Sequence, residues 1–182
     1  MKRWLIAPAI ALFLFAQSSS ANADGPSNVV IATNQTDGRF VVQGRVMVSR
    51  VAGDVAAPLN FAMAQSTTCN GCTTFAVALQ LDFASRNAST IAPQNVAVAA
   101  NGGCNGCVTV AKAVQVFYTV DDPTQIPPDI SAAIRDLNSE LVRIAADRTI
   151  TPAQAESRID SVIARFLVTA LSFDAQRQIA AN

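Results

Sequence analysis

The four cysteines of the chain all lie in two copies of Cys-Asn-Gly-Cys, Cys69 to Cys72 and Cys104 to Cys107. Thiols at this spacing can form disulfides, bind a metal ion as thiolates or act as a redox-active pair. The sequence contains no histidine. This absence excludes Ser-His-Asp and Cys-His catalysis as well as zinc sites of the His-Glu-x-x-His type. The cysteines are therefore the main candidates for chemistry.

Several arrangements of the four sulfur atoms are open. Local disulfides, Cys69–Cys72 and Cys104–Cys107, fit because the two ends of a type I turn lie within the span of a disulfide. A crossed disulfide such as Cys72–Cys104 would instead join the two copies. Two Cys-x-x-Cys pairs separated by about thirty residues also resemble a four-cysteine zinc ribbon. A thioredoxin-like redox site fits least, because such a motif normally opens a helix whose N-terminus lowers the thiol pKa.

The cysteine motifs belong to a repeat that occurs three times. Residues 60–80 and 95–115 share an opening Asn, the Cys-x-x-Cys pair and a following Thr-x-Ala-x-Ala-x-Gln. A degenerate first copy begins at Asn28 and has Asp37-Gly38-Arg39-Phe40 in place of the cysteine motif. Period-two alternation on both sides of a short turn signal is typical of a β-hairpin. We therefore predict three consecutive hairpins.

The turn type predicts which residues share a face of each hairpin. A three-residue Cys-Asn-Gly loop requires positive φ at Gly71 and Gly106. It pairs Asn60 with Gln80 and sorts the strands into two faces. One face carries bulky residues such as Phe61 and Met63, which we expect in the core. The other carries alanines, which either allow close approach of a helix or second sheet or face solvent; in the second hairpin they are Ala62, Ala64, Ala76 and Ala78.

After residue 122 the pattern changes from alternating to helical. Apolar residues at Ile130, Ile134, Leu137, Leu141 and Ile144 predict a helix over about residues 129–147. Thr151 and Pro152 are typical of the N-cap and first residue of a second helix. We predict an α+β fold in one domain. In it, residues 24–122 form three repeated β-hairpins in an antiparallel sheet, and residues 123–182 form a C-terminal helical hairpin packed on that sheet.

The first residues predict an exported protein. Lys2 and Arg3 precede an apolar run, Trp4 to Ala16, and Ala21-Asn22-Ala23 has the small-x-small pattern of a cleavage site. This is typical of a signal peptide covering residues 1–23. We therefore expect a secreted or extracytoplasmic protein with no transmembrane segment in the mature chain. An oxidising compartment favours local disulfides among the arrangements above.

The repeats also carry a resemblance. The pattern Asn-x-Ala-x-Ala, Cys-x-x-Cys, Thr-x-Ala-x-Ala-x-Gln, followed by two helices, resembles a family of secreted bacterial proteins of unknown function, often labelled "peptide zinc metalloprotease" proteins. The resemblance includes the Thr36-Asp37-Gly38 tip and the connection at residues 50–55. It implies that the four cysteines are structural positions. The label itself implies a metal-dependent peptidase, for which this sequence has no histidine.

Composition narrows the class of protein further. The chain has 13 basic and 13 acidic residues, which gives no electrostatic footprint for nucleic acid. We expect a secreted or cell-surface structural or interaction protein without a catalytic site or cofactor, with self-association or a protein partner as its interaction. The alternatives are a zinc-binding protein, a metal-dependent peptidase or a thiol redox protein. Each alternative would use Cys69, Cys72, Cys104 and Cys107.

Overall fold

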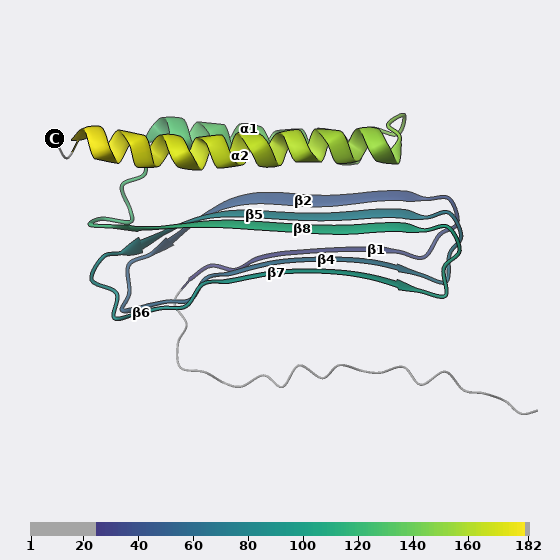
Figure 1. The fold of residues 1–182 in the computed structure, drawn as a ribbon, viewed down its shortest axis with the longest axis horizontal. Helices are drawn as coiled ribbons and strands as arrows, with labels where there is room; N and C mark the ends of the chain where they lie inside the picture. The colour runs from purple at the N-terminus through teal and green to yellow at the C-terminus, as the bar shows by residue number, and fades with distance from the viewer. Residues whose placement is uncertain (1–24, 181–182) are drawn as a thin grey trace, which may run out of the picture.

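The computed structural model describes residues 25–180, so the predicted signal peptide lies outside the described residues. Two stacked sheets and a pair of helices form three layers (Figure 1). The strands are β1 (Asn28–Asn34), β2 (Phe40–Val51), β3 (Val55–Ala56), β4 (Leu59–Thr67), β5 (Thr73–Ser85), β6 (Thr90–Ile91), β7 (Gln94–Gly102) and β8 (Val108–Val120). The helices are α1 (Pro128–Ala146) and α2 (Pro152–Ala180).

All strands pair in parallel. One sheet has the order β1-β4-β7, the other has the order β2-β5-β8, and the short strands β3 and β6 pair separately. Each sequence repeat contributes one strand to each of the two large sheets. The repeat is therefore a β-arch, in which the chain turns from one sheet into the facing one. We call the three arches coil 1 (β1 and β2), coil 2 (β4 and β5) and coil 3 (β7 and β8).

The prediction of antiparallel hairpins is wrong. A hairpin and an arch both alternate with period two and both need a turn, so the pattern alone does not distinguish them. In the hairpin, Phe61 would pair with Leu79 of the same repeat. In the structure, Phe61 pairs with Val29 of coil 1 and Val96 of coil 3. Backbone hydrogen bonds thus run between repeats, and the two strands of one repeat face each other through their side chains.

A ladder of asparagine side chains accounts for the parallel arrangement. Asn28, Asn60 and Asn95 occupy equivalent positions in the three coils. The Nδ2 of Asn28 donates to Oδ1 of Asn60 at 3.0 Å, and Nδ2 of Asn60 donates to Oδ1 of Asn95 at 2.8 Å. Asn60 also donates to the carbonyl oxygens of Ala78 and Val114 at 3.0 and 3.1 Å. Parallel stacking in register brings the same side chain of each repeat together, whereas a hairpin separates them.

The space between the two large sheets is filled by alanine. Ala62 and Ala64 of β4 face Ala76 and Ala78 of β5, and all four are fully buried in one cluster. Their small side chains allow the sheets to approach closely. The alanine face of each repeat therefore packs on a second sheet, which the same repeats form.

The outer faces of the two sheets differ in what covers them. The helices lie on the outer face of β2-β5-β8 (Figure 1), and their apolar residues form one core with that sheet. The largest fully buried side chains of this core include Leu79, Phe83, Leu141 and Phe166. The outer face of β1-β4-β7 instead carries partly or fully exposed apolar residues, Val29, Ile31, Phe61, Met63, Val96 and Val98, which we call the outer apolar face. The expectation that Phe61 and Met63 lie in the core is therefore wrong.

The two helices occupy the predicted positions. The apolar residues Ile130, Ile134, Leu137, Leu141 and Ile144 that predicted the first helix are all buried in α1. At the start of α2, the Thr151 and Gln154 side chains each bond to the other's backbone N–H, at 3.3 and 2.9 Å, which forms a capping box. Arg158 of α2 then binds Glu140 of α1 at 2.7 Å. Capping and this ion pair hold the helices against each other.

The ladder gives a first testable prediction. Asn60→Ala removes the central amide of the ladder, and the buried Asn28 amide loses its side-chain acceptor and keeps only backbone carbonyls, so the free energy of unfolding should fall by about 1–3 kcal/mol. Asn95→Ala is the matched control, because Asn95 is exposed at the end of the ladder and its loss should cost clearly less. Urea unfolding followed by circular dichroism measures both. Equal losses in the two variants would contradict the role of the buried ladder.

Candidate functional site

The turns that carry the cysteines stack on one another at one end of the coils. Gly71 and Gly106 both have φ of 63°, in the left-handed region that favours glycine. Asn70 and Asn105 form a parallel bridge, and the Gly71 N–H donates to the Asn105 carbonyl at 2.8 Å. The two Cys-Asn-Gly-Cys turns therefore have the same backbone shape and lie in register.

The turn of coil 1 continues this stack without cysteines. The Gly38 N–H donates to the Asn70 carbonyl at 2.8 Å, and Gly38 has the same φ of 63° as the glycines of the other two turns. The carboxylate of Asp37 accepts a hydrogen bond from the Asn70 N–H at 2.7 Å. Sequence reasoning identified Asp37 as part of a tip but not as a cap of the next turn. The stack of turns does not depend on sulfur.

Stacking gathers all four sulfur atoms. Cys69 and Cys72 of coil 2 are fully buried and joined in a disulfide, with Cα atoms 6.2 Å apart. Cys104 and Cys107 of coil 3 are half-buried free thiols. The Cys69 sulfur lies 3.7 Å from that of Cys104, and the Cys72 sulfur lies 3.1 Å from that of Cys107. Within the described residues, the four sulfurs lie within 4.8 Å of one another.

The two free thiols differ in their electrostatic surroundings. Burial raises the pKa of Cys104, but hydrogen bonds from the Cys107 thiol and from the backbone of Cys69 and Gly102 outweigh it, so the pKa is lowered overall. Burial and the neighbouring Cys104 raise the pKa of Cys107. The Cys107 thiol also donates to the Cys69 carbonyl at 3.2 Å. Cys104 is therefore the thiol of the pair that deprotonates more easily.

The sulfur geometry fits two of the predicted arrangements. Coil 2 has the local disulfide, and coil 3 has the same turn geometry with its thiols unbonded. In a tetrahedral zinc site with bonds of about 2.3 Å, neighbouring sulfurs lie about 3.8 Å apart. Cys69 lies 3.7 Å from Cys104 and 4.0 Å from Cys107, which is close to this spacing. The sulfurs of Cys72 and Cys107 lie closer, at 3.1 Å. Zinc would require all four residues as thiolates, so the residues would fit the ion once the Cys69–Cys72 disulfide is reduced and these two sulfurs move apart.

The fold removes the physical basis for a thioredoxin-like site. In such a site the N-terminus of a helix stabilises the thiolate. Here each Cys-x-x-Cys motif lies in a turn between two strands, and the described helices begin only at Pro128 and Pro152. The lowered pKa of Cys104 comes from sulfur and backbone hydrogen bonds at the turn. No helix dipole contributes to it.

A second polar cluster, which sequence reasoning missed, lies inside the coils around Asp82. The carboxylate of this fully buried residue accepts hydrogen bonds from Nε2 of Gln80 at 2.7 Å and Nε2 of Gln115 at 2.8 Å. Burial raises the pKa of Asp82, and the two glutamine hydrogen bonds only partly offset this effect. The cluster joins coil 2 to coil 3. The signal that could have located it is the glutamine that ends each cysteine-containing repeat.

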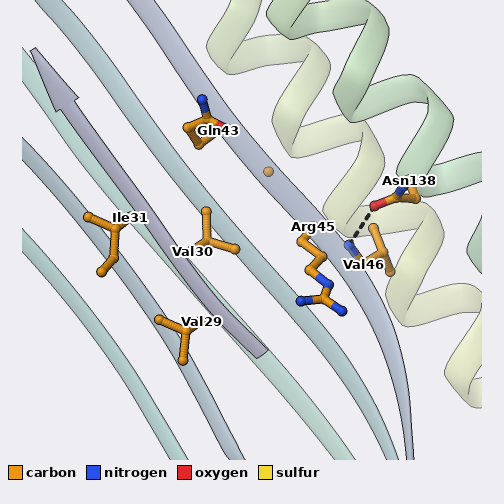
Figure 2. Close-up of a pocket in the computed structure, with 8 residues that line it drawn as sticks. Val29, Val30, Ile31, Gln43, Arg45, Val46 and Asn138 are labelled. Atoms are coloured by element: carbon orange, nitrogen blue, oxygen red, sulfur yellow. Dashed lines mark hydrogen bonds between the residues drawn. The ribbon is translucent and has the colours of Figure 1, made fainter. Parts of the chain in front are cut away.

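The end of coil 1 contains a hollow of about 460 Å³ that lies beside α1. Its lining is mixed, with apolar side chains from β1 and the polar side chains of Gln43, Arg45 and Asn138 (Figure 2). None of the four cysteines lines this hollow, and neither does Asp82. The hollow and the sulfur cluster are therefore separate features of the molecule.

Comparison with known proteins found no matching family model, no similar curated protein and no similar solved structure. The family resemblance drawn from the repeats stays a prediction. Within residues 25–180, neither helix has an apolar segment long enough to cross a membrane.

The buried carboxyl gives a prediction for pH dependence. Because the folded state raises the pKa of Asp82 above its usual value of 3.8, the folded protein retains a proton that the unfolded chain has lost. Compared with Asp82→Asn, the wild-type protein should be most stable at and below pH 3.8. This relative stability should fall as pH rises through the folded-state pKa. Urea unfolding of both proteins across this range measures the difference, and a difference that stays constant or grows with pH would contradict the prediction.

Proposed function

We propose that this protein is a secreted or cell-surface structural and interaction module, in which cysteines fasten the turns of a stacked β-arch scaffold. Its stability comes from repeat stacking, with alanine between the sheets and amide ladders inside the coils. The sequence supplies no histidine for the common hydrolytic sites. The chemistry of the sulfur cluster is then structural, and the molecule acts through its surfaces.

The observation that carries the proposal is the Cys69–Cys72 disulfide in the stacked turns. Both side chains are fully buried, so the bond is part of the folded interior. Structural disulfides persist in oxidising compartments and are rare in the cytosol. The bond therefore supports export, in agreement with the signal peptide expected from residues 1–23.

The Cys104–Cys107 turn of coil 3 is suited to a second disulfide. Its glycine has the same φ as that of the first turn, and the two turns lie in register. Formation of a Cys104–Cys107 bond removes two protons and two electrons, which pass to a disulfide oxidant of the export compartment. Each cysteine-containing coil would then carry its own fastening, and no bond would cross between coils.

Mapping of the sulfur bonds tests this function directly. The natively exported protein is alkylated without reduction, digested and analysed by mass spectrometry, and its zinc content is measured in parallel. We expect no free thiol, no zinc, and the pairs Cys69–Cys72 and Cys104–Cys107. Bonds between coils, such as Cys72–Cys104, or free thiols in the exported protein would contradict the proposal.

Paired serine variants test whether the disulfides only add stability to the fold or are required for folding. Closure of so short a loop contributes about 2 kcal/mol in the chain-entropy model. Cys69→Ser with Cys72→Ser should lower the free energy of unfolding by about that amount and keep the strand signal in circular dichroism. Cys104→Ser with Cys107→Ser is the matched pair and should behave alike in oxidised protein. Complete unfolding of either variant would contradict a structural scaffold that is stable without sulfur.

A four-thiolate zinc site is the second candidate, because all four sulfurs lie within 4.8 Å of one another. The ion would hold coil 2 against coil 3 through two residues from each, and its role would again be structural. In that case the protein contains one zinc per chain and four thiols that a chelator exposes to alkylation. Either serine pair would then abolish zinc binding. With local disulfides, each serine pair removes the bond of one coil and leaves the bond of the other coil intact.

A further inference from the structure

The two ends of the coil stack are not equivalent. At the coil 3 end, β7 and β8 are the last strands of their sheets, and no described strand pairs with their free edges. Ala97 and Ala99 of β7 are exposed there, although their counterparts Ala62 and Ala64 in coil 2 are fully buried. The interior of the stack is therefore open at this end, and we call it the open edge.

At the coil 1 end, larger side chains replace the inner alanines. Gln43 and Arg45 of β2 align with Ala76 and Ala78 of β5. At the equivalent positions of coil 2 the space between the sheets is occupied by buried alanines, whereas both Gln43 and Arg45 are exposed. They therefore extend over the end of the stack. An inward-pointing charge of this kind protects a sheet edge against pairing with another chain.

Helix α1 adds a second barrier at the same end. The Asn138 side-chain oxygen accepts a hydrogen bond from the backbone N–H of Val46 at 3.1 Å, so it occupies a donor on the edge strand β2 (Figure 2). Leu141 lies against Gly44, where an added Cβ would come within 2.9 Å of its Cδ1. Side chains of α1 thus cover part of the β2 edge, and coil 1 ends the stack.

The open edge has none of these protective features. Strand β7 contains no charged residue and no proline, and Lys112 is the one charged residue of β8. Lys112 binds Asp160 of α2 at 2.5 Å and Glu156 at 3.4 Å, which directs its charge toward the helix and away from the edge. Long uncharged edge strands are templates for strand addition.

The asparagine ladder also ends at the open edge. Nδ2 of Asn60 donates both to the next asparagine and to backbone carbonyls. Nδ2 of Asn95 donates to the Ala113 carbonyl at 3.1 Å, and the ladder has no further asparagine in the described residues. An amide group has two N–H donors, so Asn95 retains one for an acceptor beyond coil 3.

We propose that a second copy of this chain docks on the open edge, so that β7 and β8 of the two copies pair in a closed two-fold dimer. The occupant must present two strand edges at the spacing of β7 and β8, with small side chains between them. Coil 3 itself has this cross-section, as the packing of coil 2 on coil 3 demonstrates within one chain. The proposal gives the interaction module of the proposed function its partner, and it does not depend on the state of the cysteines.

Symmetry follows from the difference between the ends. Because Gln43, Arg45 and α1 obstruct the β2 edge at the coil 1 end, the open edge of one copy meets the open edge of another, and like surfaces meet about a two-fold axis. Such an axis across the stacking direction reverses the strands, so the pairing between copies is antiparallel. The nine residues of β7 and thirteen of β8 match the 20–30 residues that one side of a standard interface contributes.

The chain itself supplies the variant that tests the interface. Ala111 and Ala113 of β8 align with Ala76 and Ala78, and therefore with Gln43 and Arg45 of coil 1. Ala111→Gln with Ala113→Arg thus transfers the end residues of coil 1 to the open edge, in an arch geometry that already accepts them. Multi-angle light scattering and sedimentation equilibrium on the exported chain should show a dimer for the wild type. For the variant we expect the dissociation constant of the dimer to be at least about 100-fold higher, because the substitution places an unpaired charge in the interface.

Matched controls make each outcome decisive. Ile31→Lys places a charge on the outer apolar face, away from the open edge, and should leave the dimer unchanged. Hydrogen exchange should show protected amides at residues 95–101 in the wild type and faster exchange in the paired variant, with equal circular dichroism confirming that both are folded. A wild type that stays monomeric at high concentration, a dimer that survives the paired variant, or a dimer lost in Ile31→Lys would overturn the proposal. Open-ended polymers would also overturn it, because a closed two-fold dimer leaves no open edge for a further copy.

Sulfur mapping separates this proposal from the proposed function. A monomeric protein with both local disulfides would remove the dimer and leave the scaffold. A dimer with one zinc per chain would support the interface and replace the disulfide fastenings. The two results come from different measurements on the same sample.

Discussion

The structure depends on stacking equivalent side chains of successive repeats in register. A buried amide is costly unless its donors and acceptors are satisfied, and the fully buried Asn60 meets this requirement through the asparagines above and below it. The same register places alanine on alanine between the sheets and glycine on glycine in the turns. A shift of one residue would turn the asparagine outward and break the ladder and the alanine layer together. One constraint therefore sets strand direction, the spacing between sheets and the position of the turns.

Stacking has a consequence for where stability is concentrated. Coil 2 has a neighbour on both sides, and twelve of the thirteen residues of β5 are buried, whereas all nine residues of β7 in coil 3 are exposed. The helices reinforce this asymmetry. They cover the outer face of β2-β5-β8, and side chains of α1 also reach the edge of β2. The centre and the helix side of the molecule are therefore closed, while the edge of coil 3 and the outer apolar face depend on solvent or a partner.

Much of the local structure could be predicted from the sequence, but strand direction could not. The helical spacing of Ile130 to Ile144 and the Thr151-Pro152 start lead to helices close to those observed. Alternation located the six long strands and sorted alanine to one face, because period two is common to hairpins and arches, but it missed the short strands β3 and β6. The choice between them depends on contacts between repeats, which a local pattern does not contain. The opening asparagine was the available clue, since a polar residue on a face of small buried residues needs an equivalent partner in the next repeat.

The candidate site could be predicted only in part, because some of its contacts join different repeats. The closeness of the four cysteines follows from repetition alone, since equivalent turns meet at one end in either topology. The repeated glutamines point to a polar cluster, but the place of Asp82 in it depends on the stacking of coils, because one of its two glutamine partners, Gln115, comes from the next coil. The turn of coil 1, which has no cysteine, indicates what the sulfurs contribute to the fold. It joins the stack through Gly38 and Asp37, so the backbone register does not require sulfur there, and sulfur bonds in the other two turns reinforce it. Fastening within a coil stiffens a turn that stacking has already shaped, whereas an ion between coils would duplicate what the ladder supplies.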